Sequence, residues 1–226
     1  MATLTQTMKE KALPILDQIY NDGFIQGVIR GDISKEAVAH YLRADSLYLD
    51  SFVDIYGMLI SKCTIKEDKK FFHAQIDFIL NQEVDAHKVM ANYVGLPYEE
   101  VIKGGAWYPS ADHYIKHMFY NVYANSLAET IAAMAPCPWV YLMIARRIVA
   151  EHQIAEDHPL RDWIYFYTGD FIDEIMHELD RMVEKFAATA TEEEKQRLVN
   201  NFVQSCEHER NFFNMAYTQE RWLVEA

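Results

Sequence analysis

The residues best suited to chemistry in this sequence are a cysteine and its two flanking prolines, Pro136, Cys137 and Pro138, inside a long apolar segment. A proline has no backbone N–H and its ring crowds the carbonyl four residues earlier, so this pair should bend or break a helix. If a helix restarts there, Cys137 lies near a helix N-terminus, where the dipole favours thiolate over thiol. Cys137 is therefore a candidate nucleophile, and a buried cysteine in a proline kink is the alternative.

An acidic residue, Asp45, interrupts the apolar face of a predicted helix. Tyr41 and Tyr48 each lie one helical turn away, so an acid and two phenols share that face. Burying an acid is unfavourable by several kcal/mol unless the group is paired or used in function. Asp45 and Tyr48 are therefore candidate site residues, and a structural hydrogen bond between Asp45 and a tyrosine is the alternative.

A second inward acid, Glu209, lies on the same helical face as Cys206 and Phe213. Its spacing predicts that the carboxyl points toward the core. Pairing with a buried Arg43 or His117 would explain Glu209 without catalysis. Cys206 is a second candidate thiol, although it lacks the flanking prolines of Cys137.

Three more tyrosines, Tyr114, Tyr141 and Tyr167, lie in apolar helical stripes, and Tyr141 follows Cys137 by one turn. Aromatic stripes usually belong to a core. Several phenols, two inward acids and an activated thiol would together form a pocket for a flat, polar heterocycle. The combination indicates a small-molecule site more strongly than any single member does.

The elements that must position these residues are all predicted to be helices. The chain has eight glycines and six prolines, and no alternating runs bounded by turn residues that would indicate strands. Thr64 with Glu67 and Thr191 with Glu194 have the spacing of capping boxes. We expect one all-α domain spanning 1–226, with helices over 4–21, 24–29, 35–63, 64–93, 113–124, 126–151, 160–188 and 191–216.

Composition excludes several classes of partner and compartment. A net charge of −13 argues against nucleic acid and anionic membranes, which reward clustered Lys and Arg. Three cysteines without a CxxC pair predict neither a disulfide framework nor a zinc site. The N-terminus lacks the pattern of a secretory signal, and the uncharged run 130–145 is shorter than the roughly 20 residues of a membrane span. We therefore expect a cytoplasmic protein.

A metal site is the main chemical alternative, because helical domains also build di-iron centres from Glu-x-x-His spacings. Glu83 and His87 lie four residues apart, and Asp173 with His177 repeats that spacing. Glu174 with His177 forms one Glu-x-x-His pair. A ferritin-type site needs a second Glu-x-x-His, which the chain lacks. A metal-dependent oxidase that uses these four residues is therefore the runner-up, and we expect no bound metal.

Several segments together resemble the TenA family, the thiaminase II or aminopyrimidine aminohydrolase proteins of heme oxygenase-like helical fold. The similarity extends over nearly the whole chain. Each segment alone would be weak, and the combination is specific. The segments are 41–49 (YLRADSLYL), 113–118 (HYIKHM), 135–141 (APCPWVY), 167–170 (YTGD), and Glu209 with 212–216 (FFNMA).

The resemblance implies a role for each candidate residue. Cys137 would be the nucleophile, which puts the chain in the cysteine-containing branch of the family, and Glu209 would be the acid/base. Asp45 would hold the amino group of a pyrimidine. The pocket would be shaped by the tyrosines Tyr48, Tyr114, Tyr141 and Tyr167.

The activity implied is hydrolysis of 4-amino-5-aminomethyl-2-methylpyrimidine to the hydroxymethyl compound, which salvages thiamin breakdown products, together with cleavage of thiamin. The family resemblance also implies a homotetramer that needs no cofactor. A non-catalytic pyrimidine-binding or regulatory protein is the alternative from another class, and turnover distinguishes the two.

Overall fold

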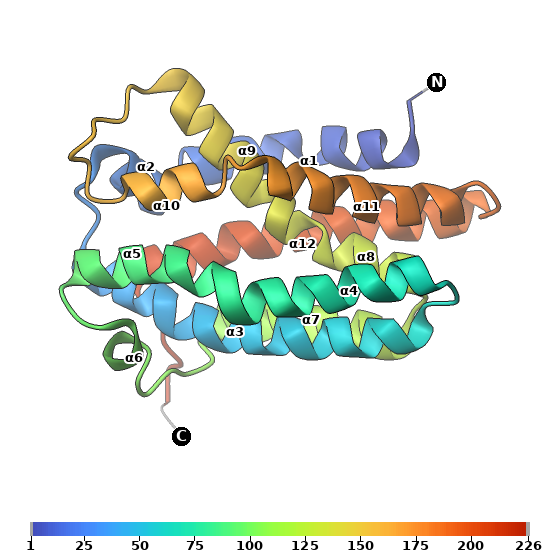
Figure 1. Cartoon of the computed structure of the whole chain (residues 1–226), viewed down its shortest axis with the longest axis horizontal. Coiled ribbons are helices and arrows are strands. Elements are labelled where there is room, and N and C mark those ends of the chain that lie inside the picture. The colour runs from blue at the N-terminus through green and yellow to red at the C-terminus, as the bar shows by residue number, and fades with distance from the viewer. Residues whose placement is uncertain (1, 225–226) are drawn as a thin grey trace.

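The computed structural model of the protein describes residues 2–224, and all regular structure in that range is helical (Figure 1). This confirms the all-α prediction. The elements are α1 (Leu4–Tyr20), α2 (Gly23–Arg30), α3 (Lys35–Lys62), α4 (Lys66–Phe78), the π-helical turn η1 (Ile79–Glu83), α5 (Val84–Val94), α6 (Tyr98–Val101), α7 (Pro109–Ala124), α8 (Leu127–Met134), α9 (Pro136–Glu151), α10 (Arg161–Phe166), α11 (Asp170–Ala187) and α12 (Glu192–Thr218).

The C-terminal helix α12 forms the centre of the bundle. It packs against α1, α3, α7, α8 and α9, and in Figure 1 it runs between α1 on one side and α3 with α7 on the other. Its inward face buries Phe202, Cys206, Glu209 and Phe213. The predicted orientation of Glu209 toward the core is therefore correct, and the carboxyl is held within the central helix.

The predicted helix from 126 to 151 breaks before the first proline. Helix α8 ends at Met134, and α9 begins with Pro136 as its first residue. A proline there loses no hydrogen bond, because the first N–H groups of a helix have no intrahelical partner. The segment Leu127–Glu151 is long and apolar enough for a membrane span, but 78% of its apolar window is buried inside the bundle. The segment therefore belongs to the core of the bundle, where other helices cover it.

Two other helices are interrupted where the sequence predicted continuity. The predicted helix 64–93 contains the π turn η1, and the predicted helix 160–188 stops at Phe166 and restarts at Asp170. The capping box at Thr64 is also wrong: Ile65 takes the extended N-cap conformation without a side-chain cap, and α4 begins at Lys66. Thr64 lies one residue too early to cap this helix.

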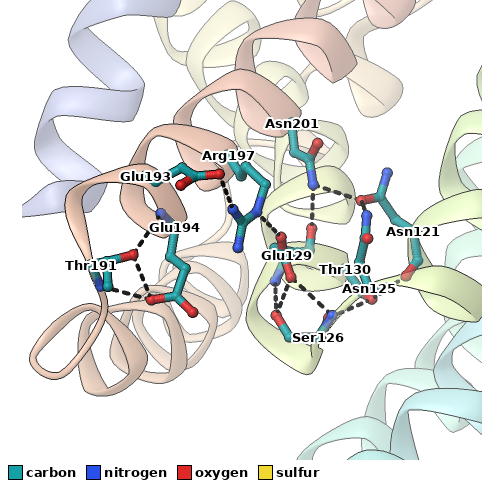
Figure 2. A network of polar contacts seen from close by, with 10 residues as sticks. All are labelled: Asn121, Asn125, Ser126, Glu129, Thr130, Thr191, Glu193, Glu194, Arg197 and Asn201. Carbon is teal, nitrogen blue, oxygen red and sulfur yellow. Dashed lines mark hydrogen bonds and ion pairs between the residues drawn. The ribbon is translucent and has the colours of Figure 1, made fainter.

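A polar network ties α12 to α7 and α8 (Figure 2). Arg197 Nε donates to Glu129 Oε1 at 2.8 Å, and Asn201 Nδ2 donates to Asn121 Oδ1 at 2.6 Å. The other oxygen of Glu129 accepts from the backbone N–H of Ser126, whose hydroxyl in turn caps the N–H of residue 129. This capping box fixes the start of α8, the helix that leads to the proline motif.

Replacing the cap residue should therefore destabilise the bundle. We expect Ser126→Ala to lower the free energy of unfolding by about 1 kcal/mol, because an orphan N–H loses its acceptor. Urea unfolding followed by circular dichroism measures this value. Ser61→Ala is the control, since that exposed hydroxyl bonds only to a carbonyl of its own helix; equal effects of both substitutions would contradict the capping role.

Candidate active site

A partly enclosed cavity of about 50 Å³ lies between α3, α4, η1, α9 and the start of α11. Its size corresponds to about four water molecules, at roughly 10–15 Å³ for each. The wall is largely apolar and aromatic. Its polar and ionisable side chains are Tyr41, Asp45, Tyr48, Tyr56, Gln75, Glu83, Cys137, Tyr141 and Tyr167.

The cysteine of the proline motif faces this cavity. Cys137 is the second residue of α9, so the predicted place near a helix N-terminus is correct, and its side chain is partly exposed. Burial and the nearby Glu209 and Glu83 raise the pKa of the Cys137 thiol well above its ordinary value, although Tyr48 opposes them, so the surroundings act against the effect expected of the helix N-terminus. A helix dipole is worth only about 0.3–1 kcal/mol and is outweighed here.

The rival thiol does not reach the cavity. Cys206 is 1% exposed and is not among the residues that line the wall. Burial, together with the charge of Glu209, raises the pKa of its thiol as well. Cys206 therefore packs as a core residue, and Cys137 is the cysteine that a bound molecule would meet.

Asp45 is paired with His87, which the sequence suggested only as a metal ligand. Its Oδ2 lies 2.8 Å from Nε2 of His87 on α5, and both side chains are buried. Burial lowers the pKa of His87, but Asp45 and Glu83 outweigh it, so the net pKa is raised. Asp45 and Glu83 therefore favour the protonated form of the His87 imidazole beside the cavity. The predicted alternative, a tyrosine partner for Asp45, is therefore wrong, because the partner is His87.

Glu209 lies behind the cavity wall. It is 2% exposed and accepts a hydrogen bond of 2.7 Å from the hydroxyl of Tyr114, and neither residue lines the cavity. Burial raises the pKa of Glu209 to about 8, with Tyr114 opposing and Asp45 adding to the shift. Arg43 instead donates to the carbonyl of residue 101, so it does not pair with Glu209.

The tyrosines form a connected aromatic wall. The hydroxyls of Tyr41 and Tyr141 are 2.5 Å apart, and the rings of Tyr141 and Tyr167 are 4.7 Å apart. The ring of Tyr48 packs against that of Tyr114 at 5.3 Å. The buried Tyr48 hydroxyl lies close enough to Cys137 and Tyr114 to affect the pKa of each, but it makes no hydrogen bond of regular geometry within residues 2–224. It is therefore placed to bond to a molecule bound beside Cys137.

The sequence reading missed Glu83 as a cavity acid and considered it only as a metal ligand. The last residue of the π turn, Glu83 lines the cavity close to Asp45, His87 and Tyr167. Burial raises its pKa to about 7, and Asp45 adds to this, while His87 and a hydrogen bond from Tyr167 oppose the shift. The Glu83 and His87 spacing was the only available signal.

The four proposed metal ligands do not meet. Glu83 and His87 lie at the cavity, whereas Asp173 accepts a 3.0 Å bond from Arg146 on another surface and His177 is exposed. Across residues 2–224 no three His, Cys, Asp or Glu side chains are arranged to hold a metal ion. The metal-oxidase alternative built on these residues is therefore wrong.

Comparison with known proteins gives consistent matches along the chain. The model of the TENA/THI-4/PQQC family matches residues 9–219. The aminopyrimidine aminohydrolase of Staphylococcus carnosus (strain TM300) is 47% identical over 218 residues, which are 96% of this chain and 95% of that protein. The protein of the same name from Staphylococcus epidermidis (strain ATCC 12228) is 45% identical over 97% of this chain and 96% of its own length.

Solved structures agree on the fold. A TenA homologue from P. horikoshii OT3 superposes with a TM-score of 0.84 at 18% identity, covering 96% of this chain and 99% of that chain. A domain with a heme oxygenase-like fold from Shewanella denitrificans gives 0.72 at 13% identity, covering 97% and 94%. These structural matches confirm the predicted fold type.

The buried carboxyl of Glu209 should make the protein less stable as pH rises. The unfolded chain releases this proton near pH 4.3, whereas the folded protein keeps it to about pH 8. The stability that the bound proton gives the folded state is therefore complete below about pH 4.3 and is lost as the pH rises to about 8. Because glutamine cannot ionise, Glu209→Gln should gain stability relative to the native protein between pH 5 and pH 8.

Urea unfolding of both proteins at several pH values measures the difference. Glu207→Gln removes a partly exposed carboxyl from the same helix and separates the effect of burial from that of net charge. A Glu209→Gln difference that stays constant across this range would show that the carboxyl is not held protonated.

Proposed function

The chain belongs to the TENA/THI-4/PQQC family, and we propose that it is an aminopyrimidine aminohydrolase. The reaction converts 4-amino-5-aminomethyl-2-methylpyrimidine to the hydroxymethyl compound and ammonia, and the same chemistry cleaves thiamin into pyrimidine and thiazole. Nearly full-length identity of 47% and 45% to proteins of that name supports this assignment. The observation that carries it is a cysteine facing an aromatic cavity with inward acids around it.

Direct displacement of ammonia from the exocyclic carbon of an aromatic ring is slow, so covalent catalysis suits this substrate. Sγ of Cys137 would add to the adjacent ring carbon while a ring nitrogen gains a proton. The resulting electron-rich enamine expels the protonated amine as neutral ammonia, which takes the electron pair of the C–N bond. Water then adds to the methylene carbon and gives up one proton. The ring nitrogen loses its proton as the S–C bond breaks, which restores the pyrimidine and leaves a Cys137 thiolate that is reprotonated.

Glu209 would transfer the protons in this series of reaction steps. In its ionised form it would take the proton of the resting Cys137 thiol, and once protonated it would give that proton to the ring nitrogen, so the addition creates no net charge. A carboxyl that titrates near neutral pH is suited to both steps, and burial gives Glu209 a pKa of about 8.

The other cavity residues would bind and orient the ring. Asp45, held in place by His87, would accept a hydrogen bond from the amino group on the pyrimidine. The hydroxyl of Tyr48, which lies close to Cys137, would donate to the ring or to its substituent. Tyr141 and Tyr167 would pack against the heterocycle, and Tyr114 would orient the Glu209 carboxyl.

We further propose that residues 1–226 form one domain that works in the cytoplasm without a cofactor, as a homotetramer, and binds neither nucleic acid nor membrane. The exposed aromatic side chains of Tyr120 and Tyr123 on α7, which are 65% and 72% exposed, provide apolar surface for self-association. Light scattering coupled to gel filtration tests the oligomeric state.

Replacing the nucleophile should separate binding from turnover. We expect Cys137→Ser to release no detectable ammonia from the aminopyrimidine, because a hydroxyl is a far poorer nucleophile than a thiolate, while hydroxymethylpyrimidine still binds. An ammonia assay and calorimetric titration measure the two properties. Cys63→Ser is the matched control, because Cys63 only donates to the carbonyl of residue 59 in its own helix and should keep full activity.

Full turnover by Cys137→Ser would refute the assigned nucleophile. A native protein that binds hydroxymethylpyrimidine but hydrolyses neither the aminopyrimidine nor thiamin would instead favour the non-catalytic binder.

Loss of the acid/base should slow the reaction without removing it. We expect Glu209→Gln to lower kcat for ammonia release by about 10²–10⁴-fold, the usual contribution of general acid–base catalysis. Steady-state assays across pH 6–9 measure the rate. An unchanged kcat and pH profile would assign proton transfer to another group.

A further inference from the structure

The cavity is lined by acidic residues and by no lysine or arginine. Its lining includes the acids Asp45 and Glu83, and Glu209 lies behind the wall, but no lysine or arginine is found among its lining residues. The positive charge next to it comes from His87. An apolar cavity with this surplus of acids favours a ligand that carries a positive charge.

Two of the three acids already have strong partners. Asp45 is paired with His87 at 2.8 Å, and Glu209 accepts from Tyr114 at 2.7 Å. Glu83 takes part in no ion pair formed by residues 2–224; it lies close to His87 and accepts a hydrogen bond from Tyr167. A carboxylate has room for several donors, so Glu83 is the acid with most remaining capacity to bind a ligand.

The backbone around Glu83 also sets it apart. A π turn inserts an extra residue into a helix, and such turns occur frequently at functional sites. Here η1 separates α4 from α5 and ends at Glu83, which lines the cavity together with Ile79 from the same turn. The interruption therefore brings one specific carboxyl to the cavity.

We propose that Glu83 is a specificity-determining residue whose carboxylate binds the protonated amine on the aminomethyl arm of the substrate. A primary alkyl amine is a cation at neutral pH, whereas the hydroxymethyl product is neutral. The ammonium group would donate charge-assisted hydrogen bonds to Glu83, which the hydroxyl of the product cannot match. This inference rests on the proposed aminohydrolase function and adds the recognition of the leaving group.

The binding of a cation at Glu83 has a chemical consequence for the reaction. Holding the amine protonated lets the C–N bond break with its electron pair leaving on neutral ammonia. The added positive charge also counteracts the acids that raise the pKa of the Cys137 thiol, so the substrate itself favours thiolate formation. After hydrolysis the neutral product loses this attraction, which favours its release.

Binding measurements in a protein that cannot turn over test the proposal. Calorimetric titration of Cys137→Ser and of Cys137→Ser/Glu83→Gln would use two ligands, the aminomethylpyrimidine and the hydroxymethylpyrimidine. We expect Glu83→Gln to weaken binding of the amine by about 10–100-fold, the equivalent of a hydrogen bond to a charged group. Binding of the alcohol should change by less than about 3-fold.

Two further variants control for charge and for shape in the same background. Glu174→Gln removes an exposed carboxyl outside the cavity wall and should leave both affinities unchanged. Glu83→Asp keeps the charge and should keep the preference for the amine over the alcohol.

The outcomes separate the two ideas. Equal weakening of both ligands by Glu83→Gln, or no weakening of either, would overturn the role of Glu83 while leaving the aminohydrolase function intact. If neither pyrimidine binds to Cys137→Ser, the proposed function itself fails and this inference fails with it.

Discussion

The crowding of negative charge in one apolar interior governs this structure. The Cys137 thiol shares its surroundings with the carboxyls of Asp45, Glu83 and Glu209, and His87 is the cation beside them. In a poorly solvated interior the three carboxyls and the thiol cannot all ionise, because each negative charge raises the pKa of the other acidic groups. The resting site therefore stores protons. The pKa values of Glu83 and Glu209, about 7 and about 8, lie near neutral pH, so the charge of a bound ligand can change the protonation of both carboxyls.

Three interruptions of helices bring the reactive groups together. The break before Pro136 presents Cys137, the π turn presents Glu83, and the gap between α10 and α11 presents Tyr167. Each interruption gives up regular i→i+4 bonding at one point of a long helix. Continuous helices α3 and α12 supply Asp45 and Glu209 as the rigid framework against which the interrupted helices are set.

Local signals in the sequence explain why part of this was predictable. Prolines at 136 and 138 have a direct steric effect on a helix, and the capping box at Thr191 forms as its spacing predicted. No residue pattern predicts a π turn, so the position of Glu83 at the cavity could not be predicted from the sequence. The pairing of Asp45 with His87 joins α3 to α5, and the acids that raise the pKa of Cys137 lie on other elements, so neither interaction follows from the local sequence.

The π turn also has an evolutionary consequence. The simplest origin of such a turn is a one-residue insertion into a straight helix, and its loss by deletion would rotate one flanking helix by about 100° relative to the other. Asp45 and His87 are anchored by α3 and by the body of α5, so their pair could persist while the residue presented at the η1 position changed. A one-residue deletion between α4 and α5 would therefore present a different side chain to the cavity while the fold and the ion pair stayed the same.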